Sequence, residues 1–197
     1  GFVEALEAEL GRAARGGYPC ALARVRLYEL DRLRELLGPR ADAAIALAVG
    51  RMLLASSSPL DLLGRAEDGS FLVLMPETEA DAVPARLDAL ARDVVRTSFS
   101  AADETLRITP LSGYAASADG EGAAGLMERA RIALDHAMAH LDLRPIRFEP
   151  AMAASAARAP KGWLARLRAY AEPLRLSSQI AATYVLGWVV PFGIYAA

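Results

Sequence analysis

The sequence predicts an α+β domain with one central mixed β-sheet flanked by helices, followed by a C-terminal membrane helix. Segments that alternate between apolar and polar residues, typical of strands, are interleaved with segments of helical periodicity. Two strand segments are separated by a short polar turn, which indicates a hairpin and hence antiparallel pairing within the sheet. The final stretch, residues 180–197, carries no charged side chain.

The N-terminal part begins with a predicted helix and a predicted strand. Residues 2–15 carry apolar side chains at helical spacing among acids and arginines, so they predict an amphipathic helix. Residues 20–28 alternate strictly and predict a half-buried strand, with Arg24 and Arg26 on its outward face. Cys20 opens this strand, and as the single cysteine it cannot form an internal disulfide.

The middle of the chain predicts three helices and a hairpin. Two helices, residues 29–37 and 41–55, are separated by a break that contains Gly and Pro. Strands over residues 60–66 and 71–75 follow, and residues 79–97 repeat apolar side chains at helical spacing. The hairpin therefore lies between two helical stretches.

Three further elements close the predicted domain, which comprises residues 1–149. They are a strand over residues 105–117, broken near Pro110, a helix over residues 122–141 and a short strand over residues 145–150.

The C-terminal residues predict attachment to a membrane. Residues 150–160 are rich in small side chains and predict a linker. Residues 178–197 predict a transmembrane helix, because their uncharged stretch of 18 residues spans roughly 27 Å, close to the hydrocarbon thickness of a bilayer. A buried core helix is the alternative. Since no polar flank follows the apolar run, we expect the natural protein to continue beyond Ala197.

Residues 161–177 predict an amphipathic helix that lies on an anionic membrane surface. The side chains expected to contact that surface are Lys161, Trp163, Arg166, Arg168 and Arg175. Because basic residues beside a span favour the cytoplasmic side, we expect the protein at the inner (cytoplasmic) membrane with its soluble domain in the cytoplasm.

Composition and local patterns argue against several functions. A net charge of −2, from 22 basic and 24 acidic residues, argues against a dedicated nucleic-acid binder. His136 and His140 have the i, i+4 spacing of a metal site, but an ordinary helix surface is the expectation. Asp31, Glu67 and Asp68 could form an acidic metal site, but here too the expectation is that they are solvated charges of a turn. We expect neither a metal nor a cofactor.

Three stretches carry a resemblance to a known family. The hairpin reads "GRAEDGSFLVLMPET", a later strand reads "LSGYA" and the last long helix reads "ARIALDHAM". Together with the order of elements, these stretches resemble the GGDEF domain of diguanylate cyclases, which make cyclic di-GMP from two GTP. The resemblance covers residues 1–149 and implies the family's nucleotidyl-cyclase-like fold. The hairpin residues shared with the family pattern are Arg65, Phe71, Leu74, Pro76 and Thr78.

The resemblance also implies that the catalytic signature is degenerate. Glu67 and Asp68 stand where the family has two glycines that approach GTP phosphate. Gly69 and Ser70 stand at its two acidic positions, of which one binds Mg²⁺ and one reads guanine, and Phe71 follows. Arg26 takes the position of the other metal-binding carboxylate, and an arginine there repels the metal.

The substrate and inhibitory positions differ as well. Asp31 corresponds to a phosphate-binding lysine, Arg34 and Ala43 to guanine-binding residues, and Met138 to a lysine of the last helix. The family's inhibitory product site, an Arg-x-x-Asp, corresponds to Ser58 and Asp61, so Asp61 is kept and the arginine is lost. A hydroxyl is a poor substitute for a bidentate guanidinium, so we do not expect cyclic di-GMP to bind there.

The charge reversals suggest an ion pair in place of the metal. We expect Arg26 to pair with Glu67 or Asp68, and an exposed pair of this kind contributes only about 0–1 kcal/mol. Drift of these residues on a solvated face is the alternative.

The predicted function is that of a non-catalytic regulatory or scaffolding domain of a membrane protein that acts through protein–protein contacts. A homo- or hetero-dimer through the domain fits this role. The resemblance implies a setting in bacterial cyclic di-GMP signalling, with membrane-bound exopolysaccharide synthesis as one candidate system. The alternative is a receptor for cyclic di-GMP or GTP with a rebuilt site; a residual enzyme is the weakest reading. The arginines available for such a rebuilt site are Arg24, Arg26, Arg34 and Arg65.

Overall fold

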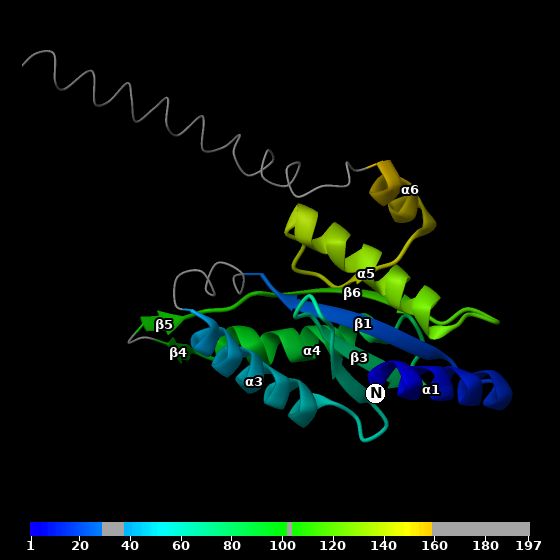
Figure 1. Ribbon diagram of the computed structural model, residues 1–197, viewed down its shortest axis with the longest axis horizontal. Coiled ribbons are helices and arrows are strands. Elements are labelled where there is room, and N and C mark those ends of the chain that lie inside the picture. Colours follow the sequence, from blue (N-terminus) through cyan, green and yellow to red (C-terminus); the bar gives the residue numbers. More distant parts are fainter. Residues whose placement is uncertain (29–37, 102–103, 159–197) are drawn as a thin grey trace, which may run out of the picture. The chain divides into compact units, whose positions relative to one another are not determined.

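The computed structural model describes residues 1–28, 38–101 and 104–158 (Figure 1). The chain divides into two compact units, Gly1–Ala156 and Ala157–Ala197, and the fold below is that of the first. The predicted helix over residues 29–37, the predicted membrane-surface helix 161–177 and the predicted span 178–197 lie outside the described residues. Within the described part, none of the helices is both long and apolar enough to cross a membrane.

Helices and strands alternate along the domain much as the sequence predicts. In chain order the elements are α1 (Phe2–Gly16), β1 (Cys20–Leu27), α3 (Pro39–Ser56), β2 (Leu62–Arg65), β3 (Phe71–Pro76), α4 (Val83–Arg96), β4 (Phe99–Ala101), β5 (Glu104–Leu106), β6 (Pro110–Ala116), α5 (Ala123–His140), β7 (Ile146–Arg147) and α6 (Pro150–Arg158).

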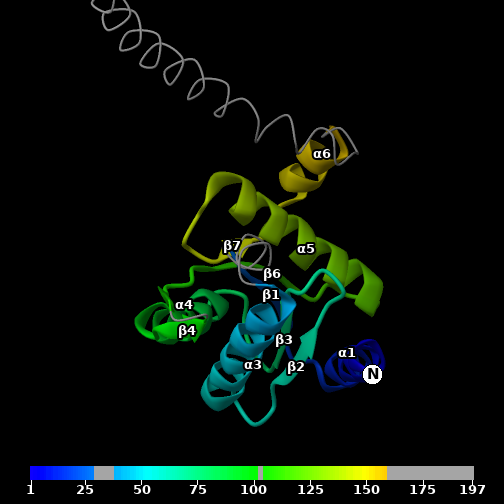
Figure 2. The same cartoon turned by 60° about the vertical axis from the view of Figure 1, so that its left-hand side comes forward.

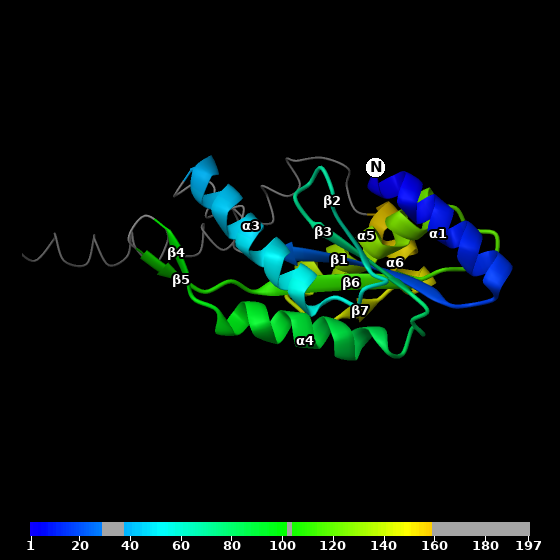
Figure 3. The ribbon, with the colours of Figure 1, turned by 90° about the horizontal axis from the view of Figure 1, so that it is seen from below.

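One five-stranded sheet, in the order β2-β3-β1-β6-β7, forms the centre of the domain. β1 pairs antiparallel with both β3 and β6, whereas β7 pairs parallel with β6. The predicted α+β class with a mixed sheet is therefore confirmed. The separate β4–β5 hairpin lies beyond one end of the sheet (Figure 1 and Figure 3).

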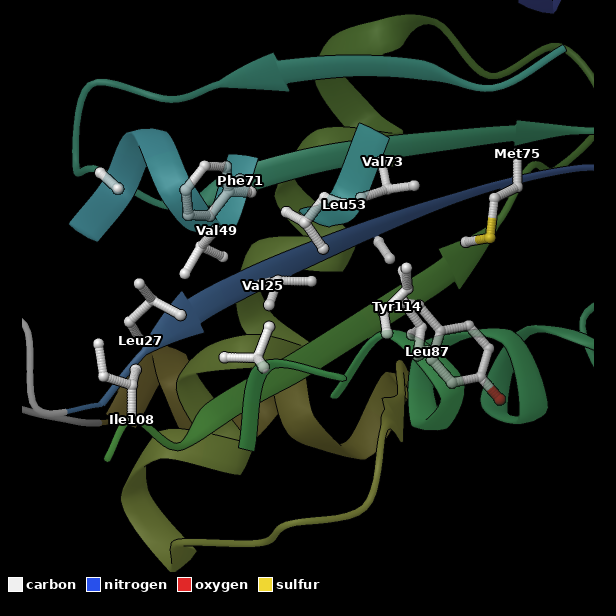
Figure 4. Packing of buried hydrophobic residues seen from close by; sticks show 14 of the residues in the cluster. Val25, Leu27, Val49, Leu53, Phe71, Val73, Met75, Leu87, Ile108 and Tyr114 are labelled. Carbon is white, nitrogen blue, oxygen red and sulfur yellow. The ribbon is translucent and has the colours of Figure 1, made fainter. Parts of the chain in front are cut away.

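Helices cover both faces of the sheet. α5 lies over one face, and α3 and α4 lie under the other (Figure 1). The larger core cluster combines α3 and α4 with alternate residues of β1 and β3, and Figure 4 shows Phe71 of β3 close to Val49 of α3. The second cluster combines α1 and α5 with Cys20 and Leu22 of β1 and with Leu72 and Leu74 of β3.

The close seating of α5 depends on one glycine. A side chain at Gly113 of β6 would bring its Cβ to 2.0 Å from the backbone nitrogen of Leu134 on α5. Backbone cannot move aside as a flexible side chain can, so only glycine permits this approach. It lets α5 lie close against β6, the strand beside β1.

Three predictions about the elements require correction. β1 is buried on both faces, not half-buried, because helices cover the sheet on each side. The predicted strand 105–117 is two strands, and β4 before it was missed. The predicted linker 150–160 contains α6, which a proline at its start and several alanines favour.

Candidate functional site

Two backbone hydrogen bonds hold the turn between β2 and β3. The amide of Ala66 donates to the carbonyl of Ser70, and the amide of Gly69 donates to the carbonyl of Ala66, both at 2.9 Å. Gly69 has φ of 81°, in the left-handed region that glycine adopts without strain. This conformation brings Asp68 and Ser70 to the side of the hairpin where β1 lies.

Arg24 of β1 binds this turn from the neighbouring strand. Its Nη2 lies 3.1 and 3.0 Å from the two carboxylate oxygens of Asp68 and 2.9 Å from Oγ of Ser70, to which its Nε also donates. The Ser70 hydroxyl in turn donates to Asp68 Oδ1 at 2.7 Å, and the Ser70 amide donates to the same oxygen. Arg24 is only 6% exposed. We call Arg24, Asp68 and Ser70 the Arg24 cluster.

Arg26 is the second cation beside Asp68. Its Nη1 lies 3.9 Å from Asp68 Oδ2, so the ion pair predicted between Arg26 and the turn is present, with Asp68 as the partner. Arg24 is nevertheless the closer partner, and because it is buried, the prediction of an outward face on a half-buried strand was wrong for this residue. The alternation of β1 correctly put both arginines on one face, but α1 and α5 cover that face.

The charges around Asp68 keep it ionised. Burial alone would raise its pKa, but hydrogen bonds from Ser70 and the positive charges of Arg24 and Arg26 outweigh burial and lower it. On α5, the pKa of Glu128 is lowered mainly by a hydrogen bond from Arg131, with a smaller contribution from the charge of Arg24. The cluster therefore lies within a wider set of opposite charges contributed by β1, the turn and α5.

The side chain of Asp61 is also buried and hydrogen-bonded within the domain. Its Oδ2 accepts a hydrogen bond from the backbone amide of Ser58 at 2.8 Å and from the guanidinium of Arg86 on α4. Arg86 also donates to Thr78 Oγ1 at 2.9 Å, and the Asp61 side chain is 1% exposed. Sequence reasoning missed Arg86, since nothing in its spacing links it to a residue 25 positions earlier.

The remaining predicted residues lie elsewhere. Ala43 of α3 and Arg65 of β2 both line an open hollow between α3 and the hairpin. The guanidinium of Arg65 lies over the Phe71 ring, 5.5 Å from its centroid. Asp31 and Arg34 lie outside the described residues, as do the predicted membrane-surface residues Lys161, Trp163, Arg166, Arg168 and Arg175.

The other sequence candidates are His136 and His140 on α5 and the buried Cys20 of β1. The rings of His136 and His140 stack at 4.2 Å, and His140 Nδ1 lies 2.9 Å from the backbone oxygen of His136. Across residues 1–28, 38–101 and 104–158, no three His, Cys, Asp or Glu side chains are grouped to hold a metal. Burial is the main cause that raises the pKa of Cys20 to about 11, so its thiol stays protonated near neutral pH.

Replacing Asp68 with Asn should destabilise the domain by about 1–3 kcal/mol, because the buried guanidinium of Arg24 then loses its charged partner. The lower end of this range is expected, since Asp68 is 39% exposed and water screens the pair. Urea unfolding of the full chain measures the change. Glu67→Gln, one residue away on the exposed turn, is the matched control and should change stability by less than about 0.5 kcal/mol.

The Asp68→Asn effect should also depend on pH. A carboxyl whose pKa is lowered by folding stabilises the protein above its unfolded pKa, near 3.8, and loses that contribution as the pH falls through the lower folded value. The difference between wild type and Asp68→Asn should therefore hold at neutral pH and shrink below about pH 4. Equal effects of Asp68→Asn and Glu67→Gln would contradict the structural role of the cluster.

Comparisons with known proteins agree on one family. The model of the family "Diguanylate cyclase, GGDEF domain" matches residues 1–141. The GGDEF domain of DgcB from Caulobacter crescentus, solved with c-di-GMP, is 21% identical with a TM-score of 0.70, over 74% of this chain and 87% of that one. The GGDEF domain of TpbB (YfiN) from Pseudomonas aeruginosa is 16% identical with a TM-score of 0.73, over 80% and 92%.

The GGDEF domain of FimX from Pseudomonas aeruginosa is similar too, at 20% identity and a TM-score of 0.66 over 74% of this chain and 90% of that one. A search of curated proteins finds no match. At these identities the solved structures show the fold. The family match, however, extends over well more than half of the 197 residues. The chain therefore belongs to the GGDEF family of cyclic di-GMP signalling.

Proposed function

We propose that this chain is a non-catalytic GGDEF domain that regulates or scaffolds a membrane system through protein contacts. The observation that carries the proposal is the Arg24 cluster. It fills the region beside the signature turn, where the family resemblance implies a metal and the phosphates of GTP, with a hydrogen-bonded ion pair of the protein itself.

The residues present do not fit a magnesium ion. Mg²⁺ needs oxygen ligands in a near-octahedral arrangement, commonly with one or two carboxylates. The positions that the resemblance assigns to metal and guanine binding hold Arg26, Gly69 and Ser70. Asp68 is already paired with Arg24 at 3.0 Å. Two unit charges of like sign about 4 Å apart repel by about 4 kcal/mol at the dielectric typical of a protein surface, so a cation beside both arginines is disfavoured.

The turn is equally unsuited to phosphate. A phosphate-binding loop presents free backbone amides to the anion. Here the amide of Gly69 donates to Ala66 and the amide of Ser70 donates to Asp68. The side chain of Asp68 adds negative charge at the same place. These contacts favour the loss of GTP binding over a merely slowed reaction.

The alternative of a rebuilt nucleotide receptor has less support. Arg24 is buried and engaged, and Arg26 lies beside Asp68. Asp61, which the resemblance places in an inhibitory product site, is held by Arg86. Of the three candidate arginines that the structure describes, Arg65 is the exposed one, and it lines the hollow beside α3. That hollow has Ala43 at the position where the resemblance implies a guanine-binding carboxylate, so it lacks the acceptor that would recognise a guanine.

Titration of the full chain with cyclic di-GMP, and with GTP plus Mg²⁺, tests the proposal. Calorimetry should give no saturable heat with either ligand, and incubation with GTP should give no cyclic di-GMP. The GGDEF domain of DgcB is a suitable positive control for cyclic di-GMP binding. Saturable binding would favour the receptor alternative, and product formation would reject the non-catalytic assignment.

The membrane setting is a second part of the proposal. The basic, aromatic character of residues 161–177 and the uncharged stretch that follows favour a domain held at the inner (cytoplasmic) membrane. The family's signalling role favours a partner in a cyclic di-GMP-linked system, such as exopolysaccharide synthesis.

Alkaline carbonate extraction of membranes from cells that express the full chain tests this setting. A transmembrane helix keeps the chain in the pellet, whereas a helix adsorbed through Arg166 and Arg168 is released because its charge contacts with the lipid headgroups are screened. Complete release of the chain would contradict the predicted span.

A further inference from the structure

One surface of the domain combines exposed apolar residues with positive charge. α3 lies beside the β2–β3 hairpin (Figure 2). The two elements border an open hollow of about 520 Å³, which we call the α3 groove. α3 contributes Ala43, Leu47, Gly50 and Leu54 to its wall, together with Arg51. The hairpin contributes Phe71 and Arg65.

The apolar wall has the spacing of a helix-packing seam. Positions 43, 47, 50 and 54 are separated by steps of four, three and four residues, the repeat with which one helix packs along another. Leu47 is 57% and Leu54 66% exposed, so each leaves most of an apolar side chain in water. Small residues at 43 and 50 alternate with these leucines and leave room for the side chains of a second helix.

Phe71 lines the floor of the groove and is itself buried. Phe71 belongs to the same core cluster as Val49 and Leu53 of α3. Figure 4 shows the ring beside Val49 on the same helix. The floor is therefore held by the core, and an occupant would meet a preformed surface.

The positive charge of the groove favours a negatively charged occupant. Its charged lining residues in the described part of the chain are Arg51 and Arg65, and no carboxylate lines it there. Residues 161–177 of the same chain carry four basic side chains and one acidic one, so they would be repelled. A nucleotide base is poorly suited too, because Ala43 offers no acceptor where the resemblance implies a guanine-binding carboxylate.

We propose that the α3 groove binds an amphipathic helix of a protein partner whose apolar stripe is flanked by acidic residues. This inference rests on the proposed function, since it assigns the protein contact to a surface that the family resemblance associates with GTP. The leucines of α3 would be buried against the apolar stripe of the partner, and Arg51 and Arg65 would pair with its carboxylates.

A pair of designed peptides tests the proposal. Both are helical and carry leucines at the spacing of the α3 seam; one has glutamates beside the leucines and the other has lysines. Fluorescence anisotropy with the full chain should show saturable binding of the glutamate peptide and about tenfold or weaker binding of the lysine peptide. The double variant Arg51→Glu with Arg65→Glu should reverse this preference.

A matched pair of variants locates the binding surface. The Leu54→Asp substitution should weaken binding of the glutamate peptide by about tenfold or more. Leu143→Asp, at an equally exposed leucine outside the groove, should leave binding unchanged. Equal binding of both peptides, or equal loss in both variants, would overturn the proposal in favour of non-specific apolar adsorption.

Two other outcomes separate this inference from the proposed function. A dimer in solution that Leu54→Asp dissociates would assign the groove to a second copy and overturn the acidic-partner proposal. If neither peptide binds and the nucleotide titrations show no binding, the helix-binding role of the groove is rejected and the non-catalytic assignment stands. Production of cyclic di-GMP would reject the proposed function on which the inference rests.

Discussion

The hydrogen-bonded ion pair of Arg24 with Asp68 and Ser70 is the contact on which the hairpin end of the domain depends. Arg24 stands on β1, the central strand, where helices cover both faces and only 6% of the residue reaches solvent. An isolated guanidinium at such a place would cost several kcal/mol. Asp68 and Ser70 offset that cost, and they reach Arg24 because Gly69 adopts the left-handed conformation that closes the turn.

Under our proposal, the framework of the family is kept although its catalytic signature is lost. The sheet order, the close approach of α5 at Gly113 and the two core clusters depend on apolar and small residues, none of which takes part in phosphate or metal chemistry. The turn can therefore exchange glycines and acids for other residues while the core remains packed. Under our proposal, the domain keeps its shape and presents surfaces such as the α3 groove to proteins.

Much of the fold could be predicted from local patterns. Alternation located β1, and the polar turn between apolar runs located the β2–β3 hairpin. That Arg24 would be buried could not be predicted, because alternation places residues on a face without telling what covers that face. The Asp61–Arg86 pair joins a loop to a helix through the tertiary fold, so no local sequence pattern predicts it. Small residues are common in linkers and in helices, so the pattern alone predicts a linker where α6 lies. Alanine is the strongest helix former, and the alanines of this segment favour the helix.

The most direct test of the account concerns the metal cation that, under our proposal, the Arg24 cluster excludes. Manganese can replace magnesium at carboxylate sites, and its electron paramagnetic resonance signal falls when the free ion becomes bound. Titration of the full chain with Mn²⁺ should show no saturable binding, and the Asp68→Asn variant should behave in the same way. Saturable binding by the wild type that is lost in Asp68→Asn would mean that Asp68 is available to a metal and would contradict the account.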